Sequence, residues 1–130
     1  MLDTDVVFAA LDRGDSHHHR TAKAVAGMIK DEDELLLSTI NYAEALVRPA
    51  GDERTFQIAV DAIAALGVRL IPPSAHVARD AARLRSLGVS LADGFALATA
   101  VASSASVASF DQRVRRAMKR LEITAPKQLG

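Results

Sequence analysis

Four acidic residues stand where predicted elements begin or end: three follow short runs that favour a β-strand, and one lies at the start of a later helix. They are Asp3, Glu44, Asp93 and Asp111. In a parallel sheet the carboxyl ends of the strands meet at one edge, and ligands bind there. We therefore expect the four carboxylates to converge, and oxygen ligands of this kind suit a hard divalent cation.

Three of these acids also have a purely structural explanation. Asp3 and Asp111 each precede a helical run, where aspartate is among the best N-cap residues. Asp93 lies three residues after Ser90, the spacing of a capping box. Taken one at a time, these three residues do not require a function.

Glu44 is harder to explain as a structural residue. Ile40 and Val47 place it on the apolar stripe of its helix, and Leu97 extends the stripe of Asp93 in the same way. Carboxylates on core-facing stripes are rarely left without a partner. The sequence therefore predicts that Glu44 and Asp93 point inward.

Clustered carboxylates need compensation. Two of them ~5 Å apart repel by roughly 3 kcal/mol at an effective dielectric constant of ~20. No lysine or arginine lies on the inward stripes, so a divalent ion, Mg²⁺ or Mn²⁺, is the natural remedy in a chain without cysteine. Such an ion can activate a water molecule for hydrolysis of a phosphodiester.

Short strand-like runs alternate with longer helical patterns over the whole chain, which predicts one domain over residues 1–130. The predicted strands are Met1–Asp3, Glu34–Ser38, Val68–Ile71, Ser106–Ser109 and a weak one near Ile123. Helical crossovers between them imply a three-layer α/β/α sandwich around a short, mainly parallel sheet of four or five strands.

The composition is that of a soluble globular protein, with 49% apolar and 25% charged residues. Sixteen basic and sixteen acidic side chains balance, so nucleic-acid binding would depend on local basic clusters. The first residues lack the features of a secretory signal, and no apolar run is long enough to span a bilayer. We expect a cytoplasmic protein without a membrane segment.

The motifs that carry the acids resemble those of a known family. "LDT" at the start, "AE" after the second strand, "LAD" before "FALATA", and "SFD" after a short strand resemble a PIN domain. The compact length and the stretch "GDSHHHRTA" are similar to VapC toxins of type II toxin–antitoxin pairs. The resemblance covers nearly the whole chain.

The resemblance implies a ribonuclease dependent on Mg²⁺ or Mn²⁺, with an antitoxin protein as partner and a homodimer as the common assembly. It implies that Asp3 and Asp93 bind metal directly, while Glu44 and Asp111 bind metal or position water. The hydroxyl groups of Thr4 and Ser109 would support the acids through hydrogen bonds.

Two positions depart from the family pattern. Asp5 stands where the family usually has Asn or Ser, so it is either a fifth carboxylate near the site or an acid stabilising the first helical turn. Gly94 follows Asp93 where the family often has alanine, and we expect it to loosen the start of that helix.

Two further features concern the substrate. Arg113 and Arg116 belong to a basic run just after Asp111 and are candidates for guiding phosphates; the alternative is a solvated helix face. Successive helical residues point about 100° apart, so His17–His19 cannot share one ion, and we expect one to pack and the others to face water. No aromatic platform for stacking bases is evident.

Two other functions remain open at this stage. The Asp3/Asp5 pair has the Asp-x-Asp spacing of a haloacid-dehalogenase-like phosphatase, in which the first aspartate attacks phosphorus. A non-catalytic PIN-like module that only binds a partner is the other alternative.

Overall fold

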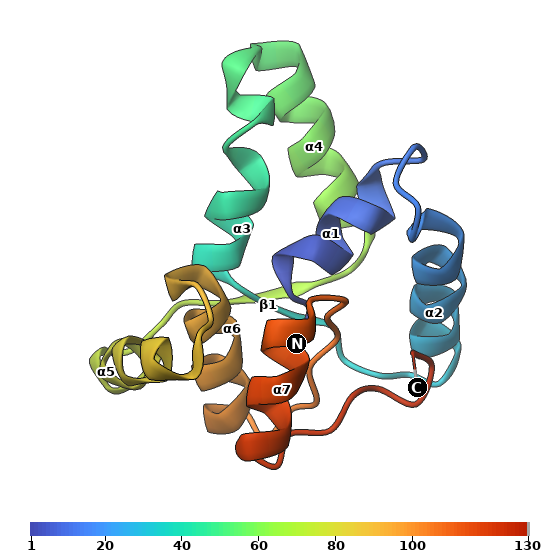
Figure 1. The fold of residues 1–130 in the computed structure, drawn as a ribbon. Helices are drawn as coiled ribbons and strands as arrows, with labels where there is room; N and C mark the ends of the chain where they lie inside the picture. The colour runs from blue at the N-terminus through green and yellow to red at the C-terminus, as the bar shows by residue number, and fades with distance from the viewer. Residues whose placement is uncertain (130) are drawn as a thin grey trace.

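The structure, a computed structural model, describes residues 1–129 and is dominated by helices (Figure 1). Within these residues the α-helices are α1 (Thr4–Leu11), α2 (His18–Lys30), α3 (Thr39–Leu46), α4 (Glu53–Ala65), α5 (Ala75–Arg83), α6 (Leu91–Ala102) and α7 (Gln112–Arg120). Two 3-10 helices, η1 (Pro49–Gly51) and η2 (Leu84–Leu87), and two strands, β1 (Leu36–Ser38) and β2 (Arg69–Ile71), complete the list.

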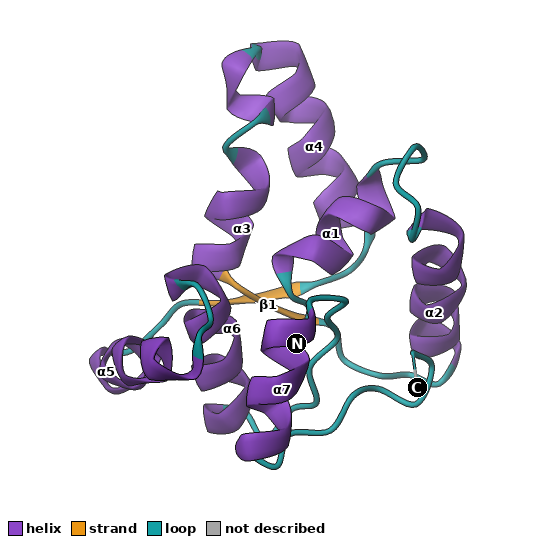
Figure 2. Cartoon of the chain, in the orientation of Figure 1, coloured by secondary structure: helices purple, strands orange, loops and turns teal. Residues whose placement is uncertain are grey.

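A small parallel sheet lies at the centre of the molecule (Figure 2). β1 and β2 pair in parallel, with Leu36 opposite Arg69. On the other side of β1, the backbone N–H of Leu2 donates to the carbonyl of Leu36 at 2.8 Å, and Leu2 forms an isolated parallel bridge with Ala108. The extended segments therefore lie side by side in the order β2, β1, residues 1–3, residues 107–108.

The predicted parallel arrangement is confirmed, but the predicted number of strands is wrong. Within residues 1–129 only two of the five predicted segments form strands. The segments at Met1–Asp3 and Ser106–Ser109 share one bridge, and the segment near Ile123 contributes a single hydrogen bond, from the N–H of Val107 to the carbonyl of Thr124 at 3.0 Å. Helix α1 begins at Thr4, so the first segment is too short to form a longer ladder.

Side chains alternate across this sheet, which separates two helical layers. Leu37 belongs to a core cluster with α1, α2, α3 and α4, whereas Leu36 belongs to a second cluster with α6 and α7. Leu2 belongs to the first cluster and Met1 to the second, as expected when successive residues of an extended segment face opposite sides. The predicted three-layer α/β/α architecture is thus confirmed, with α5 packed against α6 at its edge.

Helix starts follow the expected capping chemistry. Asp3, Ser38, Ser90 and Asp111 are N-caps whose side-chain oxygens accept backbone N–H groups of α1, α3, α6 and α7. Three of these helices begin directly after the central extended segments. Their first turns therefore meet at one edge of the sheet. None of the described helices has the length and hydrophobicity required to cross a membrane.

Candidate functional site

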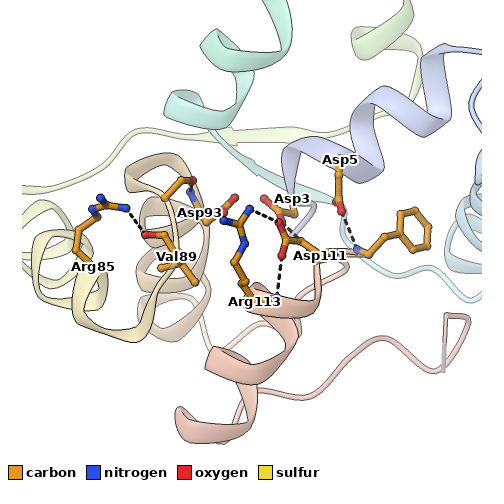
Figure 3. A network of polar contacts seen from close by, with 10 residues as sticks. Asp3, Asp5, Arg85, Val89, Asp93, Asp111 and Arg113 are labelled. Atoms are coloured by element: carbon orange, nitrogen blue, oxygen red, sulfur yellow. Dashed lines mark hydrogen bonds and ion pairs between the residues drawn. The ribbon is translucent and has the colours of Figure 1, made fainter.

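Three predicted acids come together at this edge of the sheet. Asp3, Asp93 and Asp111 come from the starts of α1, α6 and α7, and their side chains point toward one another (Figure 3). Asp5 lies next to them on the first turn of α1. Three of the four acids expected to converge therefore meet here, and Asp5 joins them in place of Glu44.

Asp3 is the most deeply buried acid, with 1% of its surface exposed. Its Oδ1 accepts the backbone N–H of Thr4 at 2.9 Å, and its Oδ2 accepts the hydroxyl of Ser109 at 2.7 Å. Burial raises the pKa of Asp3 to about 7, the Ser109 hydrogen bond opposes this, and repulsion by Asp5 and Asp93 adds to it. A carboxylate in these surroundings is stabilised by an added positive charge.

Asp5 belongs to the acidic cluster. Its Oδ2 accepts a hydrogen bond from the backbone N–H of Phe110 at 2.8 Å. This hydrogen bond connects the loop before α7 to α1. Burial raises the pKa of Asp5, and repulsion from Asp111 contributes. Asp5 thus lies near the other acids, and it also occupies the first turn of α1, so both roles considered for it agree with this geometry.

Asp111 is held by Arg113. Asp111 accepts the backbone N–H of Arg113 at 2.8 Å, and the Nη2 of Arg113 lies 3.3 Å from its Oδ2. Although partial burial opposes it, these contacts lower the pKa of Asp111. Figure 3 shows the guanidinium group between Asp93 and Asp111. A cation from the chain itself thus contacts Asp111, one of the predicted metal-site acids.

Glu44 does not face the core as predicted. It is exposed, and so is Val47, 72% of whose surface is accessible. The inward face of α3 is instead made by Asn41, Ala45 and Leu46. The prediction failed because an apolar side chain beside a carboxylate does not prove burial.

Asn41 is a site neighbour that the sequence analysis missed. Its Nδ2 donates to the hydroxyl of Thr4 at 3.0 Å and to the carbonyl of Ala92 at 3.2 Å. It therefore links the residues that follow Asp3 and precede Asp93. Glu44 lies three residues later on α3, about one turn beyond the buried Asn41, and is itself exposed.

Only one of the two predicted hydroxyl contacts to the acids is present. Ser109 donates to Asp3 as expected, whereas the hydroxyl of Thr4 accepts a hydrogen bond from Asn41 and the backbone of Thr4 serves Asp3. Arg116, one turn after Arg113, is exposed and lines a separate hollow of about 220 Å³ with Ser86 and Leu87. Arg113 is therefore the candidate substrate residue that adjoins the acids.

The site offers oxygen ligands but no preformed cage. Among residues 1–129, no three His, Cys, Asp or Glu side chains are arranged to hold a metal ion. Within the same range, the Oδ1 atoms of Asp5 and Asn41 are buried and accept no hydrogen bond from the protein. This donor set fits Mg²⁺, which usually keeps several waters and needs only one or two carboxylates.

Comparisons with known proteins agree with this fold. Residues 1–120 match the family model described as the PIN domain. No curated protein matches the chain in sequence. The crystal structure of FitAcB from Neisseria gonorrhoeae matches with a TM-score of 0.70 and 23% sequence identity, covering 98% of this chain and 96% of that one. The chain belongs to the PIN domain family.

Proposed function

We propose that this chain is a ribonuclease that hydrolyses RNA phosphodiester bonds with Mg²⁺ or Mn²⁺, and that it is the toxin of a type II toxin–antitoxin pair. The observation that carries the proposal is the buried Asp3, whose pKa is raised to about 7 beside Asp5 and Asp93. Membership of the PIN domain family supports a metal-dependent nuclease, because members of this family generally have that activity.

In this proposal Asp3 and Asp93 hold the ion. The hydrogen bond from Ser109 fixes the side chain of Asp3, and the Ser90 cap fixes the helix turn that carries Asp93. A divalent ion bound there would lower the pKa of a water molecule and neutralise charge on the phosphodiester.

The other acids have supporting roles. Asp111 lies at the same edge and could complete the ion's coordination or accept a proton from water once Arg113 moves aside. Glu44, exposed one turn beyond Asn41, is proposed to orient water from the α3 side. Arg113 would then be free to contact a phosphate of the RNA, since guanidinium groups suit that geometry.

The phosphatase alternative receives no support from the site. It assigns chemistry only to Asp3 and Asp5, and it leaves Asp93 and Asp111, which lie at the same edge of the sheet, without a role. We therefore retain hydrolysis by a metal-activated water.

The decisive experiment measures RNA cleavage by the purified chain with Mg²⁺ or Mn²⁺, with EDTA, and after Asp93→Asn. We expect cleavage with either metal and its loss with EDTA, and a fall of at least about a hundredfold for Asp93→Asn, comparable to loss of a major electrostatic contribution. Asp61→Asn, which changes an exposed acid of α4, is the control and should cleave normally. Cleavage that survives both EDTA and Asp93→Asn would overturn the mechanism, and an inert wild-type chain would favour the non-catalytic module.

An apolar groove is the proposed binding surface for a protein partner. A hollow of about 400 Å³ lies between α1, α3 and α4, and Phe8 and Ile58 on its lining are 41% and 60% exposed. Apolar surface of this kind commonly marks a protein interface. We propose an antitoxin or a second copy of the chain as its occupant.

The partner proposal is tested by expressing the chain alone and with the product of a neighbouring short gene. Copurification that is lost on Ile58→Lys, with unchanged thermal stability, would support an antitoxin. Light scattering of the chain alone tests the homodimer. A monomer that retains any copurifying partner after Ile58→Lys would show that this groove is not the interface.

A further inference from the structure

Two rings from distant parts of the chain form a stack beside the acidic site. The centroids of the His17 and Phe110 rings are 4.1 Å apart, with an angle of 10° between the ring planes. The guanidinium carbon of Arg20 lies over the Phe110 ring, 5.4 Å from its centroid. An imidazole, a phenyl ring and a cation therefore form one compact group.

This group is joined directly to the proposed catalytic residues. Phe110 lies between Ser109, which donates to Asp3, and Asp111, which belongs to the acidic cluster. The backbone N–H of Phe110 also donates to Asp5. The ring of Phe110 is thus anchored within one residue of two groups of the site.

His17 is the exposed member of the stack. It is solvent-exposed, while Phe110 is half-buried and packs against the larger core cluster. The backbone N–H of His17 donates to the Oδ1 of Asp15 at 2.8 Å, so the loop that presents His17 has a fixed turn. The pair consequently presents the imidazole to solvent on an anchored support.

The chemistry of this group matches an unpaired nucleobase. Proteins recognise single-stranded RNA by stacking its splayed bases on aromatic or histidine rings and on arginine planes. Such stacking tolerates different bases because each base has a π-face, and a nearby arginine attracts the phosphate backbone. A duplex would not present a free base face, so single-stranded RNA is the substrate class that fits.

We propose that His17, supported by Phe110 and flanked by Arg20, is a stacking subsite for one unpaired base next to the cleaved phosphate. This inference rests on the proposed ribonuclease function and specifies its substrate as single-stranded at that position. The sequence analysis did not identify this pair of rings as a stacking platform.

The experiment uses short single-stranded RNAs in which one abasic nucleotide is moved stepwise along the chain. Cleavage rates are compared for wild type, His17→Ala and His17→Phe, with His19→Ala as the matched control because His19 is the other exposed histidine of the same run. Binding of fluorescein-labelled forms of the same RNAs is measured by anisotropy in an Asp93→Asn background. Arg20 is not the primary target, because its Nη2 also donates to the carbonyl of Leu129 at 2.8 Å.

We expect one abasic position near the cut to slow wild-type cleavage and weaken binding about five- to tenfold, the lower range for loss of base stacking. His17→Ala should lose the same factor on intact RNA and become insensitive to that abasic position. His17→Phe should restore the sensitivity, and His19→Ala should behave as wild type.

Two results would contradict the stacking subsite but leave the ribonuclease assignment unaffected. In the first, His17→Ala cleaves every RNA as wild type does. In the second, His17→Ala is equally impaired on intact and abasic RNA. The second result would mean that the stack only positions the loop before α7 or contacts a protein. If wild type cleaves no RNA but the binding pattern holds, the subsite stands and catalysis fails. If RNA is neither cleaved nor bound, both proposals fall.

Discussion

Arg113 forms an ion pair with Asp111, one of the carboxylates proposed to contact the metal ion. The Nη2 of Arg113 lies 3.3 Å from Asp111, and 62% of the arginine side chain is exposed. Because like charges repel, a divalent ion bound at the acidic cluster and Arg113 compete for this carboxylate.

Replacement of Arg113 should therefore strengthen metal binding. We expect Arg113→Gln to raise the affinity for Mn²⁺ roughly three- to tenfold, since loss of one screened positive charge nearby is worth about 1 kcal/mol. Isothermal titration with Mn²⁺ measures this without RNA. Arg120→Gln removes an exposed charge from the same helix and is the matched control, expected to leave the affinity unchanged.

The same variant separates the two roles proposed for Arg113. If Arg113 also contacts a phosphate, Arg113→Gln should bind metal more tightly yet bind RNA more weakly, with a smaller dependence on salt. An unchanged Mn²⁺ affinity would mean that Arg113 serves only as a partner for the helix cap at Asp111.

At the scale of elements, Gly94 sets how closely α6 approaches α5. A Cβ atom at Gly94 would lie 2.8 Å from the carbonyl oxygen of Ala81, which is backbone and cannot rotate away. The expectation that this glycine loosens the start of α6 is therefore replaced by a packing role. It brings the first turn of α6, with Asp93, into its place against α5.

We expect Gly94→Ala to destabilise the protein by about 1–3 kcal/mol, the usual cost of overpacking, although alanine is the better helix former by about 1 kcal/mol. Chemical denaturation measures the difference. Gly51→Ala is the control, because a Cβ there meets nothing within 4 Å and the change should be within about 0.5 kcal/mol. A Gly94→Ala variant as stable as wild type would show that the two helices can separate at no cost.

The elements also show what the sequence could and could not specify. Asp3, Asp93 and Asp111 were found because each follows an extended segment or occupies a helix start, where local signals are strong. The orientation of Glu44 was misjudged because Ile40 and Val47 suggested a buried stripe, while Asn41 fills the inward position. A short helix with apolar residues on several sides does not reveal which side packs.

Contacts between distant residues had no local signal at all. His17 and Phe110 are far apart in the sequence, and neither position has a pattern that predicts stacking on the other. The predicted strands at Met1–Asp3 and Ser106–Ser109 were correct in place, since they share a parallel bridge, but too short to form a ladder. The order of the elements and the approach of the acids at the sheet edge could be predicted from single-chain patterns, whereas the contact between His17 and Phe110 could not.

At the scale of the whole molecule, the acidic cluster lowers the stability of the metal-free protein at neutral pH. Burial and neighbouring acids raise the pKa of Asp3 from 3.8 to about 7, and the pKa of Asp5 is raised as well. At pH values between 3.8 and about 7, Asp3 is therefore protonated in the folded protein but deprotonated in the unfolded chain. The stability contributed by this proton is full below pH 3.8 and is lost as the pH rises to about 7.

We therefore expect the metal-free protein to be less stable at pH 8 than at pH 5, by on the order of 2–3 kcal/mol for the shift of Asp3. Urea denaturation in EDTA, followed by circular dichroism, measures this. Asp3→Asn is the reference, because asparagine also caps helices well but does not titrate. Subtracting its pH profile removes the contributions of histidines and of other acids that both proteins share.

We expect bound Mn²⁺ to restore the stability that the metal-free protein loses as the pH rises. An ion that binds only the folded chain stabilises it by an amount that grows with the logarithm of its concentration above the dissociation constant. Because deprotonated carboxylates are the ligands, Mn²⁺ should stabilise wild type more at pH 8 than at pH 5, and it should have little effect on Asp3→Asn. Equal stability of wild type at both pH values in EDTA would mean that burial and the neighbouring acids do not disfavour a charged Asp3 in the folded protein, and the physical basis for a metal at this edge of the sheet would be lost.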